Sequence, residues 1–179
     1  MKNTRYPRPS RASGFTLLEL MTAVTVMAVL LGLGVPAFTN IMRNNQIAAE
    51  SGNLVSALQL ARSEALKRGI RISVCAAAVG ETCAGTDDWS KGWIMFADDF
   101  GSAGVLDPSD EVLQVWPAPA NNVLIRTEAT SVTFTRTARA EFPETLEVFK
   151  AGCGPGQMRE ISINLSGRVA LNRVDCPEE

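Results

Sequence analysis

The sequence predicts an α+β protein, in which a long N-terminal hydrophobic helix packs on an antiparallel β-sheet head. Three observations support this fold class. Residues 15–38 form an apolar run of about 24 residues, which is long enough for a membrane-spanning helix. Residues 39–69 repeat apolar side chains at helical spacing, and from Ile70 onward apolar and polar residues alternate as in half-buried strands. A long helix followed by a series of strands is the element order of an α+β domain.

The charges beside the apolar run predict its orientation in a membrane. The first 14 residues contain no acid and four basic residues, Lys2, Arg5, Arg8 and Arg11. Because an excess of Lys and Arg stays on the cytoplasmic side, we expect a single-pass helix with a cytoplasmic N-terminus and everything after Phe38 outside. About 140 residues follow the run, which suffices for one globular domain.

The apolar run differs from an ordinary secretory signal. Such a signal has an apolar core of about 7 to 15 residues followed by a small-residue cleavage site. Here the small residue, Gly14, precedes the run, so a cut beside it leaves the apolar helix on the mature chain. Glu19 is the only charge in the run, and an acid in hydrocarbon costs about 3 kcal/mol unless it is paired. We therefore treat Glu19 as a candidate functional residue.

The N-terminus resembles the class III signal of type IV pilins and type II secretion pseudopilins, because a basic leader is followed by GFTLLE at residues 14–19. The resemblance implies that a prepilin peptidase removes residues 1–14 by cutting after Gly14 and N-methylates Phe15. It also implies that Glu19 of an incoming subunit neutralises the Phe15 ammonium of its neighbour as helices stack in a filament. Pro36 falls where pilins commonly carry a helix-kinking proline. The alternative for Glu19 is a position near the membrane interface, where its carboxylate reaches water.

The segment after the apolar run predicts an amphipathic helix. Its apolar residues recur at steps of three and four, namely Ile47, Leu54, Val55, Leu58, Ala61, Ala65 and Leu66. Gly69 ends the pattern, and Lys67 and Arg68 lie in the last turn, where the helix dipole favours cations. We expect one helix over residues 15–69, membrane-spanning to about 38 and amphipathic after it, and a β-rich periplasmic head over residues 70–179.

The head contains several candidate strands. They are residues 71–76, 92–97, 111–116, 122–128, 131–136 and 146–150, and a last hairpin within residues 159–173. The stretch 92–116 resembles the H-type (GspH) pseudopilins and the FimT/FimU-type minor pilins, because a Gly-Trp strand, an acidic glycine-containing loop and a strand from Glu111 follow one another. This resemblance implies a minor pilin that helps to initiate or cap a type IV pilus. An H-type minor pseudopilin of a type II secretion system remains the alternative.

The resemblance also implies the partners and the location of the chain. We expect contacts with other minor and major pilins or pseudopilins, with the prepilin peptidase and with the inner-membrane assembly platform. The protein would lie in the inner membrane before it enters the pilus or pseudopilus.

The composition excludes several function classes. The chain has no histidine, which excludes histidine-dependent catalytic triads and most zinc sites. We therefore expect no enzyme, no cofactor and no metal. Without the four basic leader residues, 13 Lys and Arg face 19 Asp and Glu, so a generic basic surface for DNA is not implied. The loop from Asp98 to Glu111 is rich in acids, and calcium binding there stays an open question.

The cysteines and the last arginines give two further expectations. Four cysteines in an oxidising compartment indicate two disulfides, and of the three connectivities we favour Cys75 with Cys83 and Cys153 with Cys176. DNA-capturing members of the branch carry a Gly-Arg-x-Arg pattern, but here Gly167 and Arg168 are followed by Val169 and Ala170. A DNA-binding minor pilin for natural transformation, with contacts at Arg168 and Arg173, is therefore only a further alternative, and DNA is not an expected partner.

Overall fold

The computed structural model describes residues 14–78 and 82–176, and within this range the side chains of residues 33–37 are not described. The chain divides into two compact units, Met1–Asn40 and Ile41–Glu179. Most of the predicted leader, residues 1–13, and the predicted kink at Pro36 therefore lie outside what the structure describes. The two units are described separately below, and Ile41–Glu179 is called the head.

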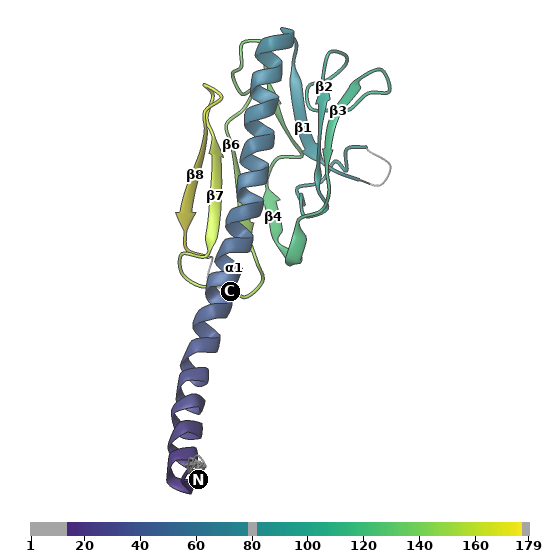
Figure 1. The fold of residues 1–179 in the computed structure, drawn as a ribbon. Coiled ribbons are helices and arrows are strands. Elements are labelled where there is room, and N and C mark those ends of the chain that lie inside the picture. Colours follow the sequence, from purple (N-terminus) through teal and green to yellow (C-terminus); the bar gives the residue numbers. More distant parts are fainter. Residues whose placement is uncertain (1–13, 79–81, 177–179) are drawn as a thin grey trace, which may run out of the picture. The chain divides into compact units, whose positions relative to one another are not determined.

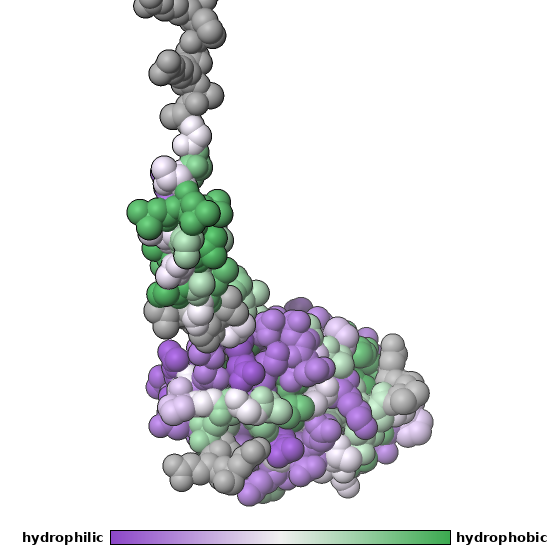
Figure 2. Space-filling view, turned by 90° about the horizontal axis from the view of Figure 1, so that it is seen from below, coloured by the Kyte–Doolittle hydropathy of each residue, from purple (hydrophilic) through white to green (hydrophobic). Residues whose placement is uncertain are grey.

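One helix, α1, runs from Leu17 to Arg68 and contributes to both units. In the N-terminal unit its apolar side chains are exposed, with Leu17 at 76% and Leu30 at 66%. Figure 2 shows these side chains grouped as a green, apolar surface. A search of the residues that the structure describes finds no helix with the length and hydropathy of a membrane span.

The second half of α1 packs into the core of the head. Its fully buried apolar residues follow helical spacing, as predicted, and are Ile47, Leu54, Ala57, Leu58, Ala61 and Ala65. Leu66, which the sequence analysis assigns to the same face, is instead 64% exposed. Gly69 ends the helix with a φ of 70°, and its N–H donates to the Ala65 carbonyl at 3.0 Å. This left-handed conformation suits glycine, which has no Cβ to collide with the backbone.

The head strands form two four-stranded antiparallel sheets (Figure 1). The first sheet has the order β3-β2-β1-β5 and consists of β1 (Ile72–Ala76), β2 (Trp93–Ala97), β3 (Glu111–Trp116) and β5 (Ser131–Phe134). The second has the order β4-β6-β7-β8 and consists of β4 (Leu124–Thr127), β6 (Glu144–Phe149), β7 (Met158–Ile163) and β8 (Val169–Val174). The predicted α+β class is confirmed, and each predicted strand has a counterpart in the sheets.

One hydrophobic core joins the helix to both sheets. It contains Leu54 and Leu58 of α1, Val74 and Met95 of the first sheet, and Ile161 of the second, all of them buried. Trp89 and Trp93 are buried in the same core. A smaller cluster covers the other face of the first sheet, with Cys75, Ala77, Ile94 and Phe96.

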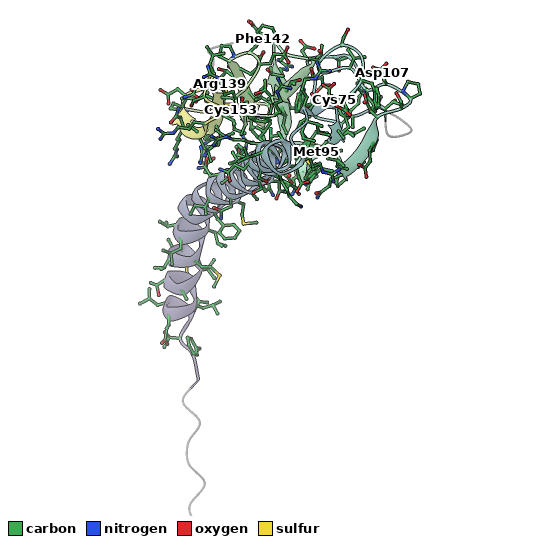
Figure 3. The ribbon with its side chains drawn as sticks, turned by 90° about the horizontal axis from the view of Figure 1, so that it is seen from above. Cys75, Met95, Asp107, Arg139, Phe142 and Cys153 are labelled. Atoms are coloured by element: carbon green, nitrogen blue, oxygen red, sulfur yellow. A yellow bond between two sulfur atoms is a disulfide. The ribbon has the colours of Figure 1, made fainter. Side chains whose placement is uncertain are left out.

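Two disulfides stabilise the head, and they have the favoured pairing. Cys75 of β1 is bonded to Cys83, and Cys153 is bonded to Cys176 near the end of the chain. Figure 3 labels one cysteine of each pair and shows Cys153 beside the yellow C-terminal strand. The second bond ties the segment after β8 to the loop between β6 and β7.

Candidate functional site

The first turn of α1 is built by Thr16. The Glu19 N–H donates to the Thr16 hydroxyl oxygen at 3.2 Å, and the Leu20 N–H donates to the Thr16 carbonyl at 3.2 Å. Thr16 is thus the N-cap residue, and Glu19 is the third helical residue, at the spacing of a capping box. The sequence analysis missed this role of Thr16, although the Thr-x-x-Glu spacing is the signal that predicts it. The cap fixes where the helix begins, and so fixes Glu19 one turn inside it.

The carboxylate of Glu19 is available to a partner. Glu19 is exposed, and in the part of the chain that the structure describes its carboxylate makes no hydrogen bond or ion pair. Glu19 and Phe15 line a surface hollow of about 560 Å³ together with apolar residues between Ala23 and Leu30. A negative charge is favoured near the helix N-terminus, where the backbone N–H groups carry partial positive charge. A charged group with apolar neighbours needs an opposite charge when water is removed.

The described surroundings of Gly14 leave room for a side chain. A Cβ added to Gly14 would meet no atom within 4 Å, and the residue lies before the helix begins. Packing among the described residues therefore does not require the absence of a side chain at this position.

In the acidic loop after β2, the carboxylates of Asp98 and Asp110 accept hydrogen bonds from the loop and from β1 and its neighbour. Asp98 is fully buried, and its oxygens accept hydrogen bonds from Arg71 at 3.1 Å, Ser73 at 2.6 Å and the Gly104 N–H at 2.7 Å. Asp110 accepts the N–H of Asp107 at 2.9 Å. Figure 3 shows Asp107 at the rim of the head. Among the described residues no three His, Cys, Asp or Glu side chains are placed to hold a metal ion.

The two arginines considered for DNA lie at opposite ends of β8. Arg168 precedes the strand and is exposed, whereas Arg173 lies near its end and donates from Nε to the Gly156 carbonyl. Five residues along a strand span about 16 Å, so the two guanidinium groups do not converge. Arg159 lies opposite Arg173, and burial, together with the Arg173 charge, lowers the pKa of Arg159.

Gly167 has a structural role in the turn between β7 and β8. Its φ is 75°, and its N–H donates to the Asn164 carbonyl at 2.8 Å. A Cβ at this position would collide with the Ala138 carbonyl oxygen, which also accepts the Arg62 Nε–H at 3.1 Å. The glycine before Arg168 is thus explained by close backbone packing.

Two family profiles match this chain, one at its N-terminus and one over most of the head. The profile of the prokaryotic N-terminal methylation motif matches residues 9–35, around Gly14, Phe15 and Glu19. The profile described as type II transport protein GspH matches residues 50–167, which is more than half of the chain. The chain belongs to the GspH family. It is a pilin-like structural subunit of the minor pilin and pseudopilin class, and its family assembles with other pilins.

Solved structures with the same fold include members of both filament systems. The type IV minor pilin FimU of Pseudomonas aeruginosa strain PAO1 is 22% identical, with a TM-score of 0.57 over 72% of this chain and 89% of that chain. The minor pseudopilin EpsH from the type 2 secretion system of Vibrio cholerae is 13% identical, with a TM-score of 0.51 over 72% and 97%. At these identities the similarity shows a common fold. No curated protein sequence matches the chain.

The candidate site residues of this GspH-family subunit fall into two groups. Phe15 and Glu19 come together on one exposed face of the N-terminal unit. The acids of the loop and the arginines of β8 are instead distributed among internal contacts or along a strand. The N-terminal face is therefore the candidate functional site.

Proposed function

We propose that this GspH-family protein is a minor pilin that helps to initiate or cap a type IV pilus, and that it acts by assembly rather than by catalysis. One observation carries the proposal: the carboxylate of Glu19 is exposed, has no partner among the described residues, and lies one turn inside a capped helix that begins just after Gly14 and Phe15. An unpaired acid on an apolar helix is costly in isolation and useful in an assembly.

The mechanism begins with processing. A prepilin peptidase cuts between Gly14 and Phe15 and methylates the new amino group, which stays positively charged. The single-pass segment 15–38 holds the processed subunit in the inner membrane, with the head in the periplasm. The assembly platform then extracts the helix into the growing filament, where other pilin helices replace lipid around its apolar side chains.

Charge neutralisation sets the register of the incoming subunit. Glu19 of this chain meets the Phe15-type ammonium of the adjacent subunit, and the ion pair forms in surroundings that contain little water. Breaking such a pair by removing one partner leaves an uncompensated charge, which costs about 3 to 5 kcal/mol. Subunits that are displaced along the axis lose this pair, so the contact selects one axial position.

A second candidate is an H-type minor pseudopilin of a type II secretion system. The match of residues 50–167 to the GspH profile favours this candidate, because that profile is described as a type II transport protein. The same N-terminal mechanism applies to both. Nucleic-acid capture is a weaker candidate, since Arg168 and Arg173 do not form one basic patch.

Deletion of the gene decides between the two filament systems. We expect the deletion strain to lose most surface pili, to regain them when the wild-type chain is supplied, and to secrete type II substrates normally. The protein should also be recovered from sheared pili. Normal piliation combined with a loss of secretion would contradict the pilus assignment and favour the pseudopilin.

A further inference from the structure

Two of the four sheet edges are covered by other parts of the head. The free side of β4 is bonded to the segment before β2, where the Trp89 N–H donates to Ile125 O at 3.0 Å and the Thr127 N–H donates to Asp87 O at 3.3 Å. The free side of β5 is bonded by the Glu141 N–H, which donates to Thr133 O at 3.0 Å. Backbone groups on the outward sides of β4 and β5 are therefore already bonded, and these edges cannot pair with a strand of another protein.

The other two edges, β3 and β8, lie on opposite sides of the head in Figure 1. Within the described residues neither has a bridge or a backbone hydrogen bond on its outward side. The pairing of β3 with β2 is shifted by an irregularity at Met95 and Phe96, and such bulges weaken an edge as a template. The register of β8 on β7 runs without a shift from Val169 to Val174. β8 is thus the regular open edge.

The backbone groups that β8 leaves free can be identified. The Asn164 N–H donates to the Arg168 carbonyl at 3.2 Å, which makes residues 164 and 168 a hydrogen-bonded pair. Because bonded and non-bonded pairs alternate along antiparallel strands, the N–H and C=O groups of Val169, Leu171 and Arg173 point away from β7. Unpaired backbone groups in this arrangement accept another strand.

The side chains of β8 and of Arg168 beside it determine which residues a partner strand must place next to them. Leu171 is 45% exposed, an apolar side chain at the rim of the sheet. Arg168 and Arg173 flank it, both are exposed, and neither forms an ion pair with a described residue. A strand laid beside β8 would place its own side chains within about 5 Å of these residues.

We propose that the β8 edge pairs with an extended segment of a different, neighbouring pilin-like subunit, one that places an apolar residue beside Leu171 and a carboxylate beside Arg168 or Arg173. The pairing extends the second sheet from this head into the neighbouring head. It rests on the proposed function, because the partner is a subunit of the same filament.

A second copy of this chain does not provide the required strand. Its β4 and β5 edges are covered, its β3 edge is irregular, and the Glu111 carboxylate of β3 is bonded to Arg68 at 2.9 Å. If β8 paired with β8 of a second copy, Arg168 and Arg173 of both copies would bring four positive charges to the paired strands, and residues 168–174 contain no carboxylate. Like charges on paired strands are destabilising. The occupant is therefore a different subunit.

Site-specific photo-crosslinking in cells that assemble filaments tests the proposal. A photoreactive amino acid replaces Leu171 in the full-length chain, and a matched chain carries it at Leu165, which has a similar exposure of 48% but lies in the turn before Gly167. We expect an adduct with another pilin-like subunit from position 171 and little or none from position 165, because only position 171 lies on the proposed contact. Mass spectrometry identifies the partner peptide.

Three outcomes would overturn the proposal: an adduct with a second copy of this chain, an adduct with DNA, or no adduct at position 171 although the chain is recovered in filaments. Failure of the unmodified chain to enter any filament would instead refute the proposed function.

A backbone substitution gives an independent test. Leu171→Pro removes an outward N–H and leaves the bonds to β7, whereas Leu171→Ala removes the side chain but keeps the N–H. We expect recovery in filaments to fall by up to about tenfold for Leu171→Pro relative to Leu171→Ala, as the loss of one net hydrogen bond predicts. Equal recovery of the two variants at equal cellular abundance would refute the pairing. If Leu171→Pro does not accumulate, the crosslinking result decides.

Discussion

The apolar side chains of the two halves of α1 have opposite surroundings. In the N-terminal unit, Leu17 and Leu30 are 76% and 66% exposed, whereas Leu54 and Leu58 in the head are fully buried. The head half packs on two sheets that belong to the same chain. The N-terminal half has no such layer among the described residues of its own unit, and its large apolar surface needs a lipid or protein partner.

This difference suggests that the head determines the stability of the fold, whereas the N-terminal unit determines assembly. Substitutions in the head should change the free energy of unfolding, because its apolar residues already have their partners. Substitutions before Asn40 should leave the head folded and change processing or incorporation into filaments. The following predictions test that division, beginning with the largest expected effect.

Gly14→Trp should abolish removal of the leader, because the peptidase accepts only a small residue before the cut. Gly52→Ala is the matched control, since a Cβ at Gly52 also meets no atom within 4 Å and the position lies inside α1. Mass spectrometry of the purified chains should find full-length precursor for Gly14→Trp and a methylated N-terminal Phe15 for the control. A mature chain that begins beyond Ala37 in the wild type would contradict the anchor.

Leu54→Ala should lower the free energy of unfolding of the head by about 2 to 5 kcal/mol, because it opens a cavity between α1 and the sheets. Leu66→Ala, at a position 64% exposed, should change it by less than about 0.5 kcal/mol. Denaturant unfolding of the full-length chain in detergent, followed by tryptophan fluorescence, measures both. Equal losses would show that the face of α1 is wrongly assigned.

Removal of the disulfide between Cys153 and Cys176 should cost about 3 kcal/mol in the loop-entropy account, for a sequence separation of 23. The bond between Cys75 and Cys83 closes a shorter loop, with a separation of 8, and constrains the unfolded chain less. Unfolding of the double variant Cys153→Ser/Cys176→Ser checks the first value. Thiol labelling of the denatured, unreduced wild type should find no free cysteine, and two labelled cysteines would remove the premise.

Glu144→Gln should raise the stability of the head slightly at neutral pH. Burial, and then the charge of Glu128, raises the pKa of Glu144 above 4.5, so the ionised carboxylate destabilises the folded state. This cost is absent at acidic pH, where Glu144 is protonated in both states, and develops as the pH rises through the unfolded and then the folded pKa. We expect a gain below about 0.5 kcal/mol at pH 7 that vanishes near pH 4. A gain that persists at pH 4 would rule out this origin.

The sequence predicted elements whose causes are local. The strands from Ile72, Trp93 and Glu111 were predicted because short apolar or alternating runs in the local sequence specify them, and Gly69 marked the end of α1. Leu66 was assigned to the wrong face because a spacing of three or four residues does not define the edge of the buried stripe. β6 begins at Glu144, two residues before the predicted strand, because it pairs with Ile163 of a strand that comes later in the chain.

Contacts between distant segments could not be predicted in this way. The sequence showed Asp98 only as one of several acids in a loop, but Asp98 is buried because Arg71, Ser73 and the Gly104 N–H donate hydrogen bonds to its carboxylate. The open edge of β8 likewise depends on the strand order of the second sheet, which alternation does not specify. For the candidate site, the residues Gly14, Phe15 and Glu19 could be named from the sequence, whereas the Thr16 cap that orients Glu19 was missed.

Incorporation of a Glu19→Ala chain into filaments tests the central claim most directly. The matched control is Thr22→Ala, because Thr22 lines the same surface hollow and carries no charge. Both chains should be made, processed and retained in the membrane at wild-type levels, since Gly14 and Phe15 are unchanged and loss of a charge favours insertion. We predict that the Thr22→Ala chain is recovered in sheared filaments and that the Glu19→Ala chain is not. Normal recovery of Glu19→Ala at normal abundance would contradict the account.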